Sequence, residues 1–426
     1  MRRTQMLIAL TAVTAVALAS CGRESESGDG EAAPQTGEEV STEDVAGTID
    51  VWAMGAEGEK LPELAKDFEA AHDGVTVNVT AIPWDSAHDK FVTSIAAGTT
   101  PDLAMVGTTW MGEFAGLDAL DPAPGSIDSA AFFEGAQSTT EVDGTAYGVP
   151  WYVETRLVYY RTDIAEKAGY DEVPTDWEGF HQMAADLQAK GGSEWGISLQ
   201  PGAVGSWQTV LPFAWTNGAE VAAEDQYTFD TPEMTEAVEY YQSFFTDGIA
   251  DTKPVADELI ANFTSGDEPM FISGPWMRSL VEDAGGEGFA DKYDVAPVPM
   301  PEGGSSSSFV GGSNLAVFKE TDNRDTAWAF VQWLTEPQTQ IDWYEMTTDL
   351  PSVQAAWDDE ALTSDPKLAA FGTQLETAQA PPSFPTWEEV VTSFDTAIEQ
   401  VTKSGADPAK ALQDVQSQAE SIGTGQ

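Results

Sequence analysis

The chain has 426 residues, of which 42% are hydrophobic and 10% aromatic, so apolar side chains suffice for globular cores. A single core stops growing at about 250–300 residues, so two lobes are expected. Lys and Arg number 18 against 72 Asp and Glu, and the formal charge of −54 argues against binding to nucleic-acid phosphates or anionic lipid.

The first residues predict an exported lipoprotein. Arg2 and Arg3 precede an apolar run from Met6 to Ala19, which is long enough for a signal peptide but short for a membrane span. The run ends in Leu-Ala-Ser-Cys, and Cys21 is the single cysteine of the chain. We therefore expect residues 1–20 to be a lipoprotein signal peptide. Lipid on Cys21 would then anchor the protein to the outer face of the cytoplasmic membrane.

Residues 21–46 begin with this cysteine and continue with many acids, Gly and Ser and almost no bulky apolar side chain. Such a composition cannot offset the entropy lost on ordering. The segment is therefore predicted to be a disordered acidic tether.

Strands and helices then alternate along the chain. The pattern predicts strands over 49–54, 75–81 and 103–106, separated by helices over 59–71 and 85–97. This order is typical of a parallel α/β sheet, where ligands bind beyond the carboxyl ends of the strands. The loops expected at that edge contain residues 55–58, Trp84 and residues 107–110.

The stretch Gly148–Asp163, GVPWYVETRLVYYRTD, places aromatic rings beside an acid and a base in a β-prone run. At period two, side chains of this run share or flank one face of a strand: Trp151, Tyr152, Glu154 and Arg156. An apolar ring beside a carboxylate suits a sugar, whose faces are rich in C–H and whose edge carries hydroxyls. An ordinary core strand with an Arg reaching to solvent fits the stretch equally well.

Beyond residue 155 the pattern predicts a second α/β lobe. Helices are expected over 177–190, 231–246 and 325–335, strands over 196–199, 269–272 and 315–318, and mostly helix from 352. Residues 200–218 are expected to form an aromatic-rich loop. The chain is expected to cross between lobes near 155 and 305, which divides it into 47–152 plus 305–350 and 153–304 plus 351–426.

No enzyme motif stands out. The three His residues lie in separate segments without metal-ligand spacing, Gly-x-Ser-x-Gly is absent, and Gly55–Gly58 lacks the Lys-Ser/Thr of a phosphate loop. We therefore expect no metal and no cofactor. With 72 acids, a pair of carboxylates suited to glycoside hydrolysis stays open as an alternative.

Several segments occur in a fixed order over residues 47–423: IDVWAMGAEGEKLPELAKDFEA, IAAGTTPDLAMVG, DGTAYGVPWYVETRLVYYRTD, FTSGDEPMFISGPWM, and GGSNLAVFK followed by AWAFVQWL and LPS. In this order they resemble the extracellular solute-binding proteins of bacterial sugar ABC importers, of the maltose-binding-protein type. The resemblance implies a two-lobed periplasmic-binding-protein fold of type II, with a doubly wound, mostly parallel sheet and flanking helices in each lobe and a hinge of crossing strands. It also implies a monomer without catalytic activity that delivers carbohydrate to transmembrane permease subunits.

Within this resemblance, Glu154 stands at the acid beside the hinge that hydrogen-bonds sugar hydroxyls, and Trp276 at a stacking tryptophan. Trp207 or Trp215 would supply a second ring, and Trp387 or Phe384 a third. The remaining expected ligand contacts are Trp151, Tyr152, Arg156, Trp84, Thr109, Trp110, Asn217, Gly312 and Asn314.

The first lobe departs from the maltose binder at two places. Ala56 and Glu57 stand where that protein has a charged pair, and Thr109 followed by Trp110 stands where it has an acid. These differences argue against maltose itself and leave the sugar open. A quaternary ammonium solute, held by rings and an acid, is a further alternative to a sugar.

Overall fold

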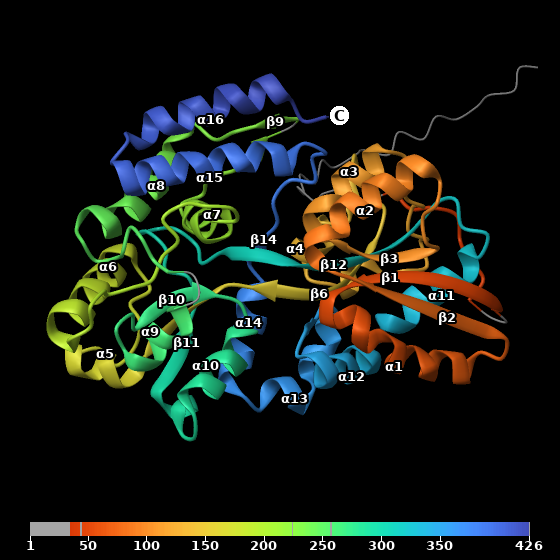
Figure 1. Ribbon diagram of the computed structural model, residues 1–426, viewed down its shortest axis with the longest axis horizontal. Coiled ribbons are helices and arrows are strands. Elements are labelled where there is room, and N and C mark those ends of the chain that lie inside the picture. Colours follow the sequence, from red (N-terminus) through yellow and green to blue (C-terminus); the bar gives the residue numbers. More distant parts are fainter. Residues whose placement is uncertain (1–34, 43–44, 224, 256–257, 426) are drawn as a thin grey trace, which may run out of the picture. The chain divides into compact units, whose positions relative to one another are not determined.

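The computed structural model describes residues 35–42, 45–223, 225–255 and 258–425 (Figure 1). The predicted signal peptide and Cys21 lie outside these residues, so both stay predictions. Among the described helices, none combines the length and apolar character that crossing a membrane requires.

The described end of the acidic segment is paired with the body of the protein, unlike a free tether. The backbone N–H of Gln35 donates to the carbonyl of Gly144 at 2.7 Å, and that of Gly37 donates to Ala123 at 2.8 Å. Val45 is buried, and Val40 packs against the same core. Backbone pairing and two apolar side chains offset the entropy lost on ordering this part of the segment. The composition of the segment as a whole did not predict this.

The first sheet contains three parallel strands with β1 (Gly47–Met54) between β2 (Val75–Ile82) and β3 (Leu103–Gly107). Helices α1 (Gly55–Ala71) and α2 (Trp84–Ala97) connect them, which confirms the predicted alternation. Residues 55–58 are not a loop but the first turn of α1, where Glu57 complements the positive end of the helix dipole. Figure 1 shows α1 and α11 (Arg324–Leu334) on one face of this sheet, and α2 and α3 (Met111–Gly116) on the other.

Two long strands link the lobes. β6 (Val149–Thr155) pairs antiparallel with β12 (Ser308–Val317), and Figure 1 shows them running side by side. Each strand contributes to more than one core, because Trp151 and Leu315 pack in the first lobe while Val153 and Val310 pack in another cluster. These two strands are therefore the crossing strands expected at a hinge.

The predicted β-prone run breaks at Arg156 into β6 and β7 (Leu157–Arg161). Ser308 causes the break by taking the place of a ladder partner. Its hydroxyl accepts from the Arg156 backbone N–H at 3.3 Å and donates to the Arg156 carbonyl at 2.8 Å.

The second sheet differs from the prediction of mostly parallel strands. β7 lies between β10 (Met270–Ser273) and β11 (Tyr293–Ala296), and both pairs are antiparallel. The expected strand over 196–199 joins only through a parallel bridge from Ser198 to Phe271. Whether two strands are parallel or antiparallel depends on the direction in which the chain re-enters the sheet. The hydrophobic pattern of a strand does not indicate this direction.

Helices surround the second sheet: α5 (Thr162–Ala168), α6 (Trp177–Asp186) continued by a π-helical turn over Leu187–Gly191, α7 (Trp207–Thr216), α8 (Pro232–Thr246), α9 (Leu259–Ser265), α10 (Met277–Gly285), α15 (Trp387–Ser404) and α16 (Pro408–Ile422). The other helices are α4 (Glu134–Ser138), α12 (Pro337–Thr347), α13 (Glu360–Thr363) and α14 (Pro366–Leu375). Short strands complete the fold: β4 (Glu141–Val142), β5 (Thr145–Ala146), β8 (Ala222–Ala223), β9 (Gln226–Tyr227), β13 (Leu350–Pro351) and β14 (Ala378–Gln379).

Helix α7 corrects the expectation of a loop over 200–218. Its N-terminus is capped from another helix, because Asp395 of α15 accepts hydrogen bonds from the backbone N–H groups of Gly205 (2.7 Å) and Trp207 (2.9 Å) and from the Ser206 hydroxyl (2.7 Å). A cap supplied from a distant segment leaves no local sequence signal.

Candidate functional site

A cavity of about 440 Å³ lies beside β6 and β12, with walls from both lobes. The first lobe contributes residues that follow β1, β2 and β3, so the carboxyl ends of these strands meet at the cavity as predicted. The lining consists of Glu57, Trp84, Gly107, Thr108, Thr109, Trp110, Tyr152, Val153, Glu154, Gln208, Pro275, Trp276, Phe309, Gly311, Gly312, Thr347, Thr348, Asp349 and Leu350.

Aromatic rings form much of the cavity wall. Trp84 and Trp276 are 41% and 38% exposed, although large apolar side chains are usually covered. Trp110 meets Trp84 edge to face with centroids 6.0 Å apart. An exposed ring in a concave wall is free to stack on a flat, C–H-rich ligand face.

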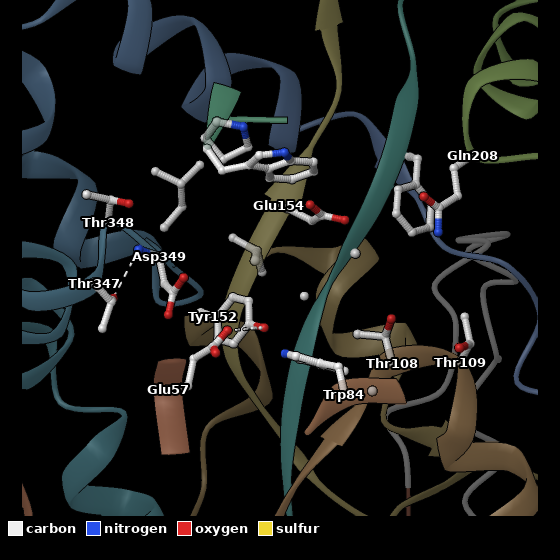
Figure 2. A pocket seen from close by; sticks show the side chains of 18 of the residues that line it. Glu57, Trp84, Thr108, Thr109, Tyr152, Glu154, Gln208, Thr347, Thr348 and Asp349 are labelled. Atoms are coloured by element: carbon white, nitrogen blue, oxygen red, sulfur yellow. Dashed lines mark hydrogen bonds between the residues drawn. The ribbon is translucent and has the colours of Figure 1, made fainter. Parts of the chain in front are cut away.

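Three carboxyl groups face the same cavity. The Tyr152 hydroxyl donates to Glu57 Oε1 at 3.1 Å, and the Trp343 ring N–H donates to Asp349 Oδ2 at 3.1 Å. Figure 2 shows Glu57, Tyr152 and Asp349 together on one side, with Glu154 across from them. None of the described residues that line this cavity is a Lys or an Arg, so the wall accepts hydrogen bonds and is negatively charged.

Arg156 supports this wall from behind. Its Nη2 donates to Glu154 Oε1 at 3.2 Å and to Gln208 Oε1 at 2.8 Å, and its guanidinium lies 4.7 Å from the centre of the Trp276 ring. Arg156 itself does not line the cavity. Its role in the geometry is to hold Glu154, Gln208 and Trp276 in place.

Burial changes the acidity of all three carboxyl groups. It raises the pKa of Glu57, and it raises the pKa of Glu154 although Arg156 acts in the opposite direction. Burial, together with the charge of Glu57, raises the pKa of Asp349 to about 7. An acid with such a pKa exists in both protonation states near neutral pH and can donate or accept a hydrogen bond.

This shift predicts how stability depends on pH. Because the folded protein holds the Asp349 proton to about pH 7 and the unfolded chain releases it near the ordinary value of 3.8, stability is lost as pH rises between these values. The stability of Asp349→Asn relative to the natural protein should therefore increase as pH rises across this window. Above pH 7 we expect the free energy of unfolding to have gained at least about 1.4 kcal/mol, which corresponds to a pKa shift of one unit. Urea unfolding from pH 4 to 8 measures the difference.

Asp342→Asn is the matched control, because Asp342 is an exposed acid on α12, which ends just before Asp349. A stability difference for Asp349→Asn that stays constant from pH 4 to 8 would contradict the assignment.

The structure brings some of the predicted contacts together. Glu154, Trp276, Tyr152, Trp84, Thr109, Trp110 and Gly312 all line the cavity, and Arg156 adjoins it through Glu154. Whether they contact a ligand stays a prediction.

The other predicted contacts lie elsewhere. The Trp151 ring is fully buried and stacks on Trp343 at 4.7 Å, while Trp207, Trp215 and Trp387 are 4%, 3% and 1% exposed within the second-lobe core. Trp151 was predicted as a ligand contact from its place in the β-prone run and the other three from the family resemblance, but all four are core side chains. Phe384 is likewise 8% exposed and packs against Tyr227.

The two predicted amide contacts also have other partners. Asn217 donates to the Glu233 carbonyl at 2.9 Å and to Glu236 at 3.1 Å, at the end of α7. Asn314 is fully buried, and its side-chain amide donates to the Thr139 hydroxyl at 2.9 Å. Neither lines the cavity.

The lining residues that were not predicted as ligand contacts include Glu57, Gln208, Phe309 and Asp349. The sequence marked Glu57 only as a departure from the maltose binder. Gln208 lies in the segment expected to be a loop, and Asp349 directly precedes the LPS motif. The sequence signal that could have identified Asp349 as a lining residue was therefore its position next to this motif.

Comparison with known proteins decides the family. A family model described as bacterial extracellular solute-binding protein matches residues 53–341, more than half of the chain. The chain belongs to this family. The solute-binding protein is also similar to the solved structure of the sugar-binding protein MalE from Xanthomonas citri, with 31% identity and a TM-score of 0.83 over 88% of this chain and 97% of that chain.

Two relatives from Bacillus subtilis match most of their own length. The galactooligosaccharide-binding protein is 23% identical over 414 residues, which are 95% of this chain and 93% of the relative. The maltodextrin-binding protein MdxE is 25% identical over 361 residues, which are 80% and 81% of the two chains. The predicted family and the type II binding-protein fold are thus confirmed, and the proteins it resembles are binding proteins, not enzymes.

Proposed function

We propose that this solute-binding protein captures an oligosaccharide between its lobes and delivers it to the permease of an ABC importer. The observation that carries the proposal is one cavity with exposed Trp84 and Trp276 beside the carboxyl groups of Glu57 and Glu154. Rings stack on sugar faces and carboxylates accept from sugar hydroxyls. Relatives named for galactooligosaccharide and maltodextrin binding support the same ligand class.

The proposed mechanism is closure of the two lobes around the sugar. The lobes are 47–152 plus 305–350 and 153–304 plus 351–426, hinged at β6 and β12. A ligand that touches both lobes favours the closed form, and moving the population from 1:99 to 99:1 takes about 5.5 kcal/mol of differential binding. Two stacked rings and several charge-assisted hydrogen bonds supply roughly 1–3 kcal/mol each.

The proposal includes the location of the protein. Lipid on Cys21 would hold the molecule at the outer face of the cytoplasmic membrane, beside the permease. The protein performs no chemistry on the sugar.

A thermal-shift screen over mono- and oligosaccharides tests the function. We expect one oligosaccharide to raise the melting temperature with a saturable dose response, because a ligand that binds only the folded state stabilises it. Betaine and choline in the same screen test the quaternary ammonium alternative. Stabilisation by these cations and by no sugar would refute the proposal.

A reducing-end assay after incubation with the oligosaccharide distinguishes a binding protein from a glycoside hydrolase. We expect the sugar to be recovered intact. Release of reducing ends by the purified protein would contradict the proposed function.

A further inference from the structure

A second cavity of about 360 Å³ adjoins the first within the second lobe. Gln208 lines both cavities, and Arg156, which holds Glu154 at the edge of the first, lines the second. The Arg156–Gln208 hydrogen bond of 2.8 Å thus forms part of the partition between them.

The second cavity is unusual in its charge. Arg156, Lys253 and Lys403 line it, three of only 18 basic residues in a chain with a formal charge of −54. Glu268 is the one acid among the described lining residues, and burial raises its pKa, which favours the neutral form. The wall therefore carries net positive charge, whereas the first cavity carries negative charge.

The basic groups of this wall are incompletely paired. Arg156 Nε is buried and has no hydrogen-bond partner among the described residues. Lys403 Nζ lies 3.0 Å from Glu399 Oε1, but that acid is 49% exposed, so solvent weakens the pair. A buried donor without a partner is costly, and an anion supplied by a ligand would satisfy it.

Part of the remaining wall is apolar and fixed in place. Leu199, Phe271 and Ile272 are 3%, 1% and 9% exposed and line the cavity. The adjoining loop is held by hydrogen bonds of 2.7 Å from Tyr241 to the Gln200 carbonyl and 2.8 Å from Thr402 to the Pro201 carbonyl. A preformed cavity with an apolar side and convergent charges is typical of a small-molecule site.

We propose that the second cavity binds an organic carboxylate, whose charged group faces Arg156, Lys253 and Lys403 and whose apolar part packs on Leu199 and Ile272. Because the two cavities adjoin, this carboxylate has two possible sources. It is either an acidic unit at the end of an oligosaccharide that begins in the first cavity, or a separate small molecule.

Calorimetric titration of the full chain with glucuronate, and with glucose as its neutral counterpart, tests the site. Lys253→Gln/Lys403→Gln is expected to weaken glucuronate binding by about tenfold or more through loss of charge-assisted contacts. Lys410→Gln is the matched control, since Lys410 also pairs with an acid four residues away on a helix but lies outside the cavity. Absence of glucuronate binding, or equal affinity in the double variant, would overturn the proposal.

Two further titrations assign the source. The first titration compares an oligosaccharide that has a terminal uronate with a neutral one of equal length. The double variant should bind the acidic oligosaccharide more weakly, and the neutral one equally well, only if the carboxylate belongs to the sugar chain. The second titration adds glucuronate to protein that is saturated with the neutral oligosaccharide. Unchanged affinity for glucuronate would show that the carboxylate belongs to a separate small molecule. Binding of the neutral oligosaccharide in these experiments reports on the first cavity alone, so failure of the second site leaves the proposed function testable.

Discussion

Glu154→Ala is expected to weaken oligosaccharide binding by about a hundredfold or more. The side chain is only 19% exposed and faces the cavity, so its carboxylate is positioned to accept from sugar hydroxyls in a partly dehydrated site. Its removal also takes away the acid that pairs with Arg156 at 3.2 Å, which frees the guanidinium beside Trp276. Calorimetry with the sugar that stabilises the protein most measures the loss.

Glu154→Gln separates charge from shape in the same experiment. The amide keeps the size and one acceptor oxygen but loses the charge, so an intermediate loss of about tenfold is expected. Asp414→Ala, at an exposed acid on α16, controls for the removal of one negative charge. Unchanged affinity in Glu154→Ala would remove Glu154 from the ligand site.

The period of a β-strand explains which residues of the stretch Gly148–Asp163 could be predicted. Tyr152 and Glu154 are two residues apart and both line the cavity, as alternation requires. Trp151 is the neighbour of Tyr152, so it points to the opposite face and packs on Trp343. Strict use of the period would have excluded Trp151, because adjacent side chains of a strand do not share a face.

The prediction that Trp207 or Trp215 of the second lobe contacts the ligand was wrong for a different reason. From Trp207 to Thr216 every residue of α7 except the half-buried Gln208 is buried, so this helix is apolar nearly all round. A helix that is apolar all round lies inside a protein, and its rings belong to the core. Gly and Pro around it suggested a loop, while the cap that starts the helix comes from Asp395, far along the chain.

The residues that the sequence did not mark depend on tertiary structure alone. Gln208 reaches the first cavity because α7 packs on β12, and Phe309 reaches it because β12 crosses between the lobes. Neither lies in a recognised motif, and the order of segments along the chain identifies a family without identifying such contacts.

Gly312→Ala is expected to damage both stability and binding through the hinge. Gly312 has a φ of +118°, and a Cβ atom there would lie 2.2 Å from the carbonyl oxygen of Tyr152 on the paired strand. We expect a loss of about 3 kcal/mol or more in the free energy of unfolding, from backbone strain together with the displaced strand. Urea denaturation measures it.

The effect on binding follows from the same contact. Gly312 pairs with Val153, between Tyr152 and Glu154, so a shift of β12 away from β6 moves both cavity residues. Gly303→Ala is the matched control, because Gly303 has a φ of +82° but nothing within 4 Å of the added Cβ. It should lose only about 1 kcal/mol from strain and bind sugar normally. Equal losses of stability in the two variants, with unchanged sugar affinity in Gly312→Ala, would show that the close approach of β6 and β12 does not set the geometry of the cavity.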